Sequence, residues 1–419
     1  MSKSDENKRR VPKLRFPGFT EDWEQRKLSE MCGTFEYGLN AAAKEFDGKN
    51  KYIRITDIDD ASREFLLSDL SSPDICLDGM SKYLLSSGDI VFARTGASVG
   101  KTYIYRENDG IVYFAGFLIR AKVNQDNDAE FVFQSTLSPS YEKYIRITSQ
   151  RSGQPGVNAQ EYGEYDLFAP SKEEQQRIGQ FLRGIDNLIT LHQRKCDRLK
   201  ELKKGLLQKM FPKNGEKIPE LRFSGFTEDW EQRKLSEVAL SFEYGLNAAA
   251  KEFDGVNKYL RITDIDDSSR IFKDDDLTSP DTDLSAASSY QLHDGEILFA
   301  RTGASVGKSF IYRESDDCVY FAGFLIRAKI KAEYDPEFIF QNTLGVPYEK
   351  YIQITSQRSG QPGVNAQEYG EYAFLVPDYA EQKKIGGFLR QIDNLITLHQ
   401  RKLDHLKELK KGLLQQMFV

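Results

Sequence analysis

The chain has 419 residues, of which 39% are hydrophobic and 12% aromatic, and its formal net charge is −6 at pH 7. This composition indicates a folded protein of two or three domains, and the mild negative charge argues against a surface coated in nucleic acid without excluding local basic grooves. The polar N-terminus lacks the apolar core of a signal peptide, and no stretch approaches the ~18 apolar residues of a membrane span. We therefore expect a cytoplasmic protein with no membrane partner.

The cysteines lie far apart in the chain and show no CxxC spacing. They are Cys32, Cys76, Cys196 and Cys318. A disulfide framework or a zinc site is therefore not expected, and a reducing compartment fits this usage.

A mixed α/β (α+β) domain is predicted over residues 14–170, after a polar tail at residues 1–13. Runs of β-branched and aromatic residues predict strands at 91–93, 103–105 and 117–122. Residues 129–137 and 141–147 are typical of helical or mixed structure.

The first polar motif of this domain is the alternating stretch YIRITDIDD, which predicts a strand leading into carboxylates. Arg54 and Thr56 share one face of that strand and are candidate DNA contacts. Asp57, Asp59 and Asp60 allow a metal site as an alternative, but no histidine lies nearby. We prefer a solvated or turn-capping acidic cluster.

The second motif is ARTGASVGKT, which resembles the phosphate-binding pattern GxxxxGK[ST]. Gly96 and Gly100 enclose only three residues, however, and Thr95 occupies the position of the required glycine. A nucleotide-hydrolysing site and an ordinary turn remain alternatives. We favour a glycine-rich turn that presents polar groups to DNA phosphate or guanine, namely Arg94, Thr95, Ser98 and Lys101.

The third motif is the loop TSQRSGQPGVN, in which glycines and a proline interrupt regular structure. Arginine pairs with guanine, and glutamine or asparagine with adenine, through planar two-point contacts. A structural loop with solvated side chains is the alternative. The candidate base-reading residues are Gln150, Arg151, Ser152, Gln154 and Asn158.

A long helix is predicted over residues 171–213, opened by a capping box of Ser171 and Glu174. At ~1.5 Å per residue it forms a rod of roughly 60 Å. Apolar residues at steps of three and four predict a coiled-coil seam made of Ile178, Phe181, Ile185, Leu188, Leu199, Leu202 and Leu206. Further apolar residues widen that seam on one side, namely Leu182, Ile189, Cys196 and Met210.

The remainder of the chain repeats this plan. Trp230 follows Trp23 by 207 positions, and Phe418 follows Phe211 by the same number. The register holds without a gap, and roughly seven in ten positions are identical. A second domain is therefore predicted at 214–377 and a second long helix at 378–419.

The two helices are expected to pair as an antiparallel coiled coil with pseudo-twofold symmetry. The second domain supplies its own candidate DNA contacts, which are Arg261, Thr263, Arg301, Thr302, Ser305, Lys308, Gln357, Arg358, Ser359, Gln361 and Asn365.

Several common catalytic motifs are absent from the sequence. It contains no Asn/Asp-Pro-Pro-aromatic tetrapeptide, no GxGxxG and no HExxH. The chain is therefore interpreted as a binding protein without its own active site. A coiled-coil scaffold that joins two domains for non-DNA ligands is a second interpretation.

Together the motifs resemble those of the specificity subunit of type I restriction–modification enzymes. The resemblance rests on two copies of a domain that begins near VPKLRFPGF and carries YIRITDI, ARTGASVGK and GQPGVN. Each copy is followed by a long helix, the first reading FLRGIDNLITLHQRKCDRLKELKKGLLQKMF. The resemblance covers essentially the whole chain.

This resemblance implies that each domain is a non-catalytic target-recognition domain that reads one half of a bipartite site in double-stranded DNA. The helices would set the spacing between the halves and dock two modification subunits, which bind S-adenosylmethionine and methylate adenine. Two motor-nuclease restriction subunits would add translocation and cleavage with ATP and Mg²⁺. No cofactor is expected on this chain. Because its two domains are nearly identical, we expect a nearly palindromic interrupted target.

Overall fold

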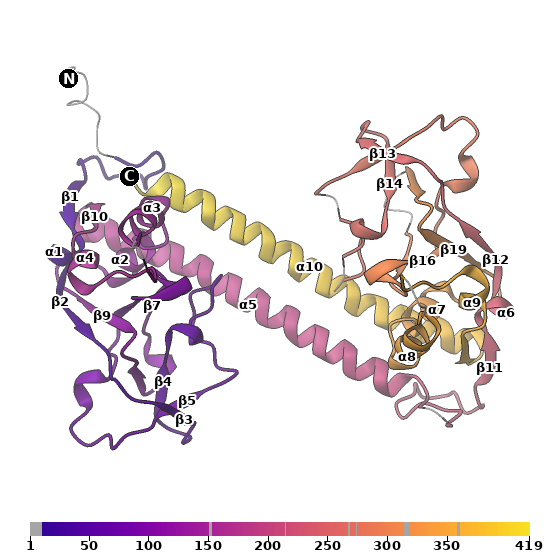
Figure 1. Ribbon diagram of the computed structural model, residues 1–419, viewed down its shortest axis with the longest axis horizontal. Helices are drawn as coiled ribbons and strands as arrows, with labels where there is room; N and C mark the ends of the chain where they lie inside the picture. Colours follow the sequence, from indigo (N-terminus) through magenta and orange to yellow (C-terminus); the bar gives the residue numbers. More distant parts are fainter. Residues whose placement is uncertain are drawn as a thin grey trace. The chain divides into compact units, whose positions relative to one another are not determined.

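The computed structural model describes residues 11–150, 153–213, 215–266, 269–273, 275–313, 318–357 and 361–419. The chain divides into two compact units, Met1–Gln193 with Lys402–Val419, and Arg194–Arg401. Each unit contains one globular domain, the first part of that domain's own helix and the last part of the other helix (Figure 1). The boundaries between the compact units therefore fall inside the helices, whereas the sequence suggested separate domains and helices.

A four-stranded antiparallel sheet forms the centre of the first domain, in the order β2-β9-β6-β7. Its two faces contribute to two different hydrophobic clusters, so β6 is buried along its whole length. This explains why its sequence, IVFA, is continuously apolar instead of alternating. The strands are β2 (Cys32–Tyr37), β6 (Ile90–Ala93), β7 (Thr102–Ile104) and β9 (Leu118–Val123).

Three shorter strand pairs complete this domain. β1 (Glu24–Lys27) pairs antiparallel with β10 (Asp166–Ala169), and β3 (Ala43–Glu45) with β5 (Ser71–Pro73), whereas β4 (Lys51–Ile53) runs parallel to β8 (Val112–Phe114). The helices are α1 (Leu28–Met31), α2 (Ala129–Ser135), α3 (Pro139–Thr148) and α4 (Ala159–Gly163), and the 3-10 turns are η1 (Ile55–Asp57), η2 (Ser81–Tyr83), η3 (Gly96–Ser98) and η4 (Glu107–Asp109).

The predicted strands and helices of this domain are confirmed with one correction. The strand that was expected to continue to Asp59 ends at Ile53, and the chain enters η1. The backbone N–H of Arg54 donates to Asp57 Oδ2 at 2.9 Å, which turns the chain out of the extended conformation. Arg54 and Thr56 therefore do not share the face of a strand.

The second domain repeats the first, with the sheet order β12-β19-β16-β17. Its strands are β11 (Glu231–Lys234), β12 (Ala239–Tyr244), β13 (Ala249–Glu252), β14 (Asn257–Leu260), β15 (Thr278–Asp281), β16 (Ile297–Ala300), β17 (Ser309–Ile311), β18 (Cys318–Phe321), β19 (Leu325–Ile330) and β20 (Ala373–Val376). Its helices are α6 (Leu235–Val238), α7 (Pro336–Asn342), α8 (Val346–Thr355) and α9 (Ala366–Gly370), and its described 3-10 turns are η5 (Ile262–Asp264), η6 (Ser288–Tyr290) and η7 (Gly303–Ser305).

The long helices are α5 (Lys172–Met210) and α10 (Tyr379–Met417). The backbone N–H of Glu174 donates to Ser171 Oγ at 3.4 Å, which is one half of the predicted capping box. The Glu174 carboxylate instead accepts two 2.7 Å hydrogen bonds from Arg15. The segment before β1 therefore fixes the start of the helix.

Within each unit the helix portions pair antiparallel, and the same two positions form an ion pair. Lys410 Nζ donates to Asp186 Oδ1 at 2.5 Å in the first unit, and Lys203 Nζ to Asp393 Oδ1 at 2.6 Å in the second. Asp393 follows Asp186 by 207 residues, and Lys410 follows Lys203 by the same number. The helix that supplies the aspartate in one unit therefore supplies the lysine in the other, as in an isologous contact.

The buried seam of α5 differs from the predicted one. The four residues that were expected only to widen the seam are all buried. Two of the predicted seam residues are buried with them. The buried set is Ile178, Leu182, Ile185, Ile189, Cys196 and Met210. Phe181, Leu188 and Leu202, which the periodicity placed in the seam, are exposed. Both sets have helical spacing, so periodicity alone does not tell which one meets the partner.

A close approach between α2 and α5 ties the domain to the helix. A Cβ atom on Gly179 would lie 2.5 Å from Asp128 Oδ1, so only glycine fits there without a shift. The Asp128 side chain caps α2, and its backbone N–H donates to Gln175 Oε1 at 3.0 Å.

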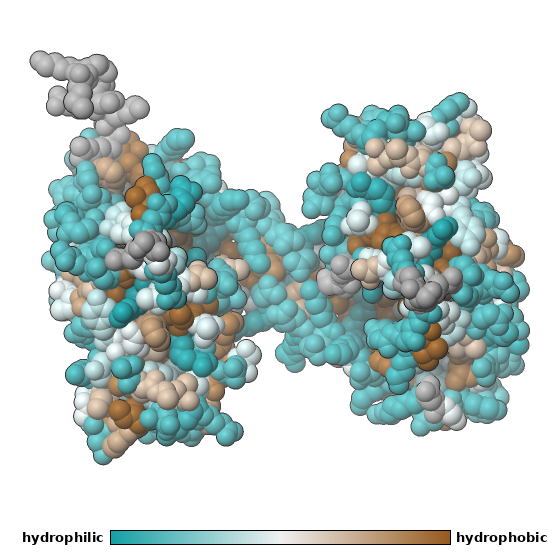
Figure 2. Space-filling view, viewed as in Figure 1, coloured by the Kyte–Doolittle hydropathy of each residue, from teal (hydrophilic) through white to brown (hydrophobic). Residues whose placement is uncertain are grey.

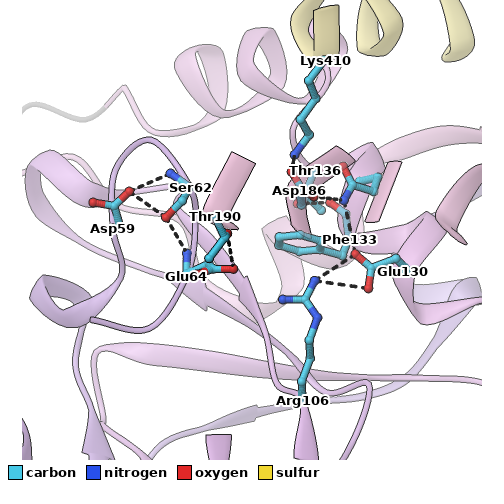
Figure 3. A network of polar contacts seen from close by, with 11 residues as sticks. Asp59, Ser62, Glu64, Arg106, Glu130, Phe133, Thr136, Asp186, Thr190 and Lys410 are labelled. Carbon is cyan, nitrogen blue, oxygen red and sulfur yellow. Dashed lines mark hydrogen bonds and ion pairs between the residues drawn. The ribbon is translucent and has the colours of Figure 1, made fainter. Parts of the chain in front are cut away.

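Farther along α5, Asp186 also accepts a 2.7 Å hydrogen bond from Gln134 of α2 (Figure 3). Beside it, Arg106 pairs with Glu130 at 3.1 Å. Burial raises the pKa of Glu130, and Arg106 offsets part of that effect.

None of the described helices has the length and apolar character that a membrane span needs. None of the four cysteines, all of which lie in the described parts of the chain, forms a disulfide, and burial raises the pKa of Cys32 to about 12. That thiol is therefore unreactive at neutral pH.

Candidate DNA interface

Two of the sequence motifs come together as one surface in the first domain. The backbone N–H of Gly96 donates to the Pro155 carbonyl at 3.0 Å, and that of Val157 to the Arg94 carbonyl at 2.9 Å. Thr95 and Gly156 form an antiparallel bridge between these contacts. The turn after β6 and the loop before α4 are therefore joined by backbone hydrogen bonds.

The second domain has the same junction. Gly303 donates to the Pro362 carbonyl at 3.0 Å, and Val364 to the Arg301 carbonyl at 2.9 Å. Each domain therefore presents the same pair of joined loops.

Arg94 is held over the ring of Tyr37, with its guanidinium carbon 5.0 Å from the ring centroid. The Tyr37 hydroxyl accepts a 3.4 Å hydrogen bond from the backbone N–H of Ala159, at the start of α4. The equivalent Arg301 lies 5.2 Å from the Tyr244 centroid. Stacking on a fixed aromatic ring restricts the guanidinium while its N–H groups stay available to a ligand.

Arg54 and Thr56 line a recess of about 580 Å³ together with Arg94. All three motifs therefore contribute to one region of the first domain. Both Nε and Nη2 of Arg54 donate to Asp57 at 2.8 Å, and the hydrogen bond with Asp57 raises the pKa of Arg54. Arg261 makes the same pair with Asp264 in the second domain. Both arginines are thus already engaged, and a base contact would have to share or replace the carboxylate.

The acidic cluster caps turns. Asp59 Oδ1 accepts from the backbone N–H and hydroxyl of Ser62. Burial alone would raise the pKa of Asp59, but the hydrogen bonds from Ser62 and Ala61 outweigh it and lower that pKa. Within the described parts of the chain, no three His, Cys, Asp or Glu side chains gather in a way that could hold a metal ion.

The expected contact of Lys101 and Lys308 with phosphate needs correction. Their side chains are buried, with the residues 6% and 7% exposed. Lys101 Nζ donates to the Ile58 carbonyl at 2.9 Å and pairs with Asp60 at 2.6 Å, and Lys308 donates to the Ile265 carbonyl at 3.1 Å. These lysines therefore support the turns after β6 and β16 from the protein interior.

Asn158 and Asn365 also have a structural role as helix caps. Asn158 Oδ1 accepts from the Glu161 N–H at 2.9 Å, and the Glu161 carboxylate accepts from the Asn158 N–H at 2.8 Å. Asn365 and Glu368 form the same capping box on α9. Asparagine is a preferred helix N-cap, so the sequence allowed this role as well.

The remaining predicted contacts stay on the surface. Gln150, Gln154, Gln357 and Gln361 are exposed, as are Thr56 and Thr263, whereas Thr95, Ser98, Thr302 and Ser305 are half-buried. Arg151, Ser152, Arg358 and Ser359 lie outside the described residues. The amide nitrogen of Gln154 lies 3.1 Å from where a Cβ on Gly96 would be, and Gly96 has a φ of +74°. A glycine there allows both the turn and the overlying amide.

Sequence reasoning missed two aromatic residues of this region, Tyr37 and Phe117, and their equivalents Tyr244 and Phe324. All four are exposed by about half or more. Each aromatic residue lies next to a glycine in the sequence, at FEYG and at AGF, and this was the available signal. Figure 2 shows that the visible face of each domain is mainly hydrophilic, with small hydrophobic groups.

The surface thus combines guanidinium, amide and hydroxyl groups with aromatic rings, which suits contacts with DNA bases and phosphates. A family model described as the type I restriction modification DNA specificity domain matches residues 20–201 and 227–408.

Two relatives come from Methanocaldococcus jannaschii. The type I restriction enzyme MjaVIII specificity subunit is 23% identical, covering 99% of this chain and 96% of the relative. The putative type I restriction enzyme MjaX specificity subunit is 22% identical, covering 95% and 93%. The fold is similar to the crystal structure of the type I restriction–modification S subunit from M. genitalium, with a TM-score of 0.72, 14% identity, and coverage of 98% and 99% of the two chains.

Replacing Lys101 by Ala tests its assignment as a buried support. We expect the free energy of unfolding to fall by ~1–3 kcal/mol, because the Ile58 carbonyl loses its partner. Denaturant unfolding measures this, with the half-buried Ser98→Ala as the control that leaves stability nearly unchanged. An unaltered stability for Lys101→Ala, with a smaller salt dependence of DNA binding, would instead restore the phosphate contact.

Proposed function

Because the chain belongs to the family of type I restriction–modification specificity subunits, we propose that each domain binds one half of its DNA target through the two joined loops described above. The observation that carries this proposal is the junction of the loops, which places Arg94 on the Tyr37 ring beside the Gln154 loop. A polar surface fixed before binding loses little conformational entropy when DNA arrives. Specificity subunits are non-catalytic, and this chain has the same role.

Individual contacts follow from side-chain chemistry. Arg94 can donate two hydrogen bonds to the O6 and N7 atoms of guanine, and Gln154 can pair with adenine in the same two-point manner. Gln150 and the half-buried Thr95 and Ser98 suit phosphate or sugar oxygens. Arg301 and Gln361 would make the corresponding contacts in the second domain.

The near-identity of the domains bears on the symmetry of the target. The loop junctions, the arginine–tyrosine stacks and the ion pairs recur in both units with nearly equal distances. The ion pairs exchange their members under the repeat, which is the pattern of an antiparallel isologous pair. We therefore propose half-sites that read nearly alike on opposite strands, at a distance set by the helices.

Mapping methylated adenines in cells that carry this protein and its methyltransferase tests the proposed function. We expect an interrupted motif whose two halves are inverted copies that differ by about one base at most. Deleting the gene for this chain should abolish methylation at the motif. Two unrelated half-sites would contradict the symmetry, and methylation that persists without this chain would contradict the function.

Both long helices carry a set of exposed leucines. On α5, the exposed leucines Leu188, Leu191 and Leu202 lie on one side of the helix, away from the buried seam. On α10, they recur as Leu395, Leu398 and Leu409. Single exposed leucines are ordinary, but several on one side of a helix favour an interaction surface.

We propose that this leucine surface docks one methyltransferase subunit per helix. S-adenosylmethionine would then bind those subunits, and ATP with Mg²⁺ the motor-nuclease subunits.

Replacing Leu188 and Leu395 by Lys tests the docking surface. Each residue is 45% exposed and lysine is a comparable helix former, so the chain should stay folded. We expect at least tenfold weaker binding of the methyltransferase, measured by titration, because the partner's apolar surface would face a charge. Gln176→Lys, about 120° around α5 from Leu188 at 3.6 residues per turn, is the control that should not change affinity. Equal affinity of all variants would contradict the assignment.

A further inference from the structure

Phe117 and Phe324 stand out among the aromatic residues, because they are 60% and 61% exposed beside the candidate interface. Phe117 lies in the turn between β8 and β9, and Phe324 in the turn between β18 and β19. Neither turn packs its aromatic ring into a core. An exposed phenylalanine alone is ordinary, so a role for these two depends on the residues around them.

The backbone around Phe117 is fixed. Leu118 N–H donates to the Ala115 carbonyl at 2.8 Å, Gly116 N–H to the Leu39 carbonyl at 2.8 Å, and Arg94 N–H to the Phe117 carbonyl at 3.1 Å. The exposed ring is therefore held on a turn that is hydrogen-bonded directly to the residue that stacks on Tyr37.

Phe324 is held in the same way. Leu325 N–H donates to the Ala322 carbonyl at 2.9 Å, Gly323 N–H to the Leu246 carbonyl at 2.8 Å, and Arg301 N–H to the Phe324 carbonyl at 3.0 Å. Both domains thus present one exposed ring from a rigid turn next to the arginine of the joined loops.

A recess opens beside Phe117. Its volume is about 580 Å³, and its lining includes Tyr37, Asn40, Thr56, Arg94 and the Phe117 ring itself. Close packing at its edge brings the end of β2 against the turn, since a Cβ on Gly38 would lie 2.2 Å from the Ala115 carbonyl oxygen. Aromatic surface together with amide, hydroxyl and guanidinium groups matches the face and the edges of a nucleobase.

From these contacts we propose that Phe117 and Phe324 are wedges, each inserted beside a base of its half-site, and that the base unstacked by Phe117 lies against the recess. This inference rests on the proposed DNA-binding function and deepens it. Proteins insert apolar side chains between base steps, and the new stacking contact offsets part of the cost of unstacking. The preference for an easily unstacked step would then contribute to specificity at a position read by no hydrogen bond.

The test uses the full chain with its methyltransferase subunits and a duplex that carries the motif found by methylation mapping. Permanganate oxidation of thymines reports unstacked bases on each strand. We expect binding of the unaltered complex to create reactive thymines in both half-sites besides those paired with the target adenines, which the methyltransferase itself flips out. Phe117→Ala or Phe324→Ala should remove about half of this additional signal, and the double variant should remove all of it. Each single variant should also weaken binding by about 5- to 150-fold, the range for loss of one stacked base.

Two control variants show whether a change in permanganate reactivity is specific to the loss of the Phe117 ring. Ile111→Ala removes a partly exposed apolar side chain that precedes β8, whereas Phe117 follows that strand, so it should leave the permanganate pattern unchanged. Phe117→Trp retains a stacking ring and should retain reactivity. If the unaltered complex does not bind the duplex, the proposed function fails. If it binds without reactive thymines, or if both alanine variants leave the pattern intact, the wedge is wrong even though the protein recognises DNA.

Discussion

The carboxylate of Asp186 is the contact on which the first unit depends. It accepts hydrogen bonds from Lys410 of α10 at 2.5 Å and from Gln134 of α2 at 2.7 Å, so one side chain of α5 joins the neighbouring helix to the globular domain. Asp393 does the same with Lys203 and Gln341 in the second unit. The Asp186 side chain is largely removed from solvent, so losing either partner would leave a partly desolvated charge with less compensation. The register of the helices and the seating of each domain are therefore set by the same group.

Further contacts with α5 hold the candidate recognition surface in place. The close contact at Gly179 seats α2 on α5, and a hydrogen bond from Thr190 of α5 to Glu64 holds the hairpin that follows η1 (Figure 3). That hairpin supplies Asp60 and the Ile58 carbonyl to Lys101, which lies beneath the turn after β6. The joined loops therefore rest on a continuous series of contacts that begins at the helix. In the second domain Ile271 stands where the first has Glu64, so the side chain at this position cannot accept the equivalent hydrogen bond.

Much of this was predictable from the sequence. The long helices, the main strands and the gapless repeat follow from periodicity and composition, and the joined loops carry the motifs that were singled out. The sequence did not show whether Lys101 contacts a DNA phosphate or a buried carbonyl. A lysine that follows a glycine is compatible with either contact. Nor did it separate the two apolar stripes of α5, where Leu182 is buried and Leu188 is exposed. Both distinctions depend on which element lies opposite, and that is tertiary information.

In the first unit, Lys410 near the C-terminal end of α10 binds the Asp186 carboxylate. A double-mutant cycle on Asp186→Asn and Lys410→Met, followed by denaturant unfolding, measures that contact directly. We predict a coupling of ~0.5–3 kcal/mol for this pair and a value within ~0.5 kcal/mol of zero for Asp186 with Lys203, which lies 17 residues along the same helix. Coupling of Asp186 to Lys203, or none to Lys410, would contradict the pairing and the recognition surface built on it.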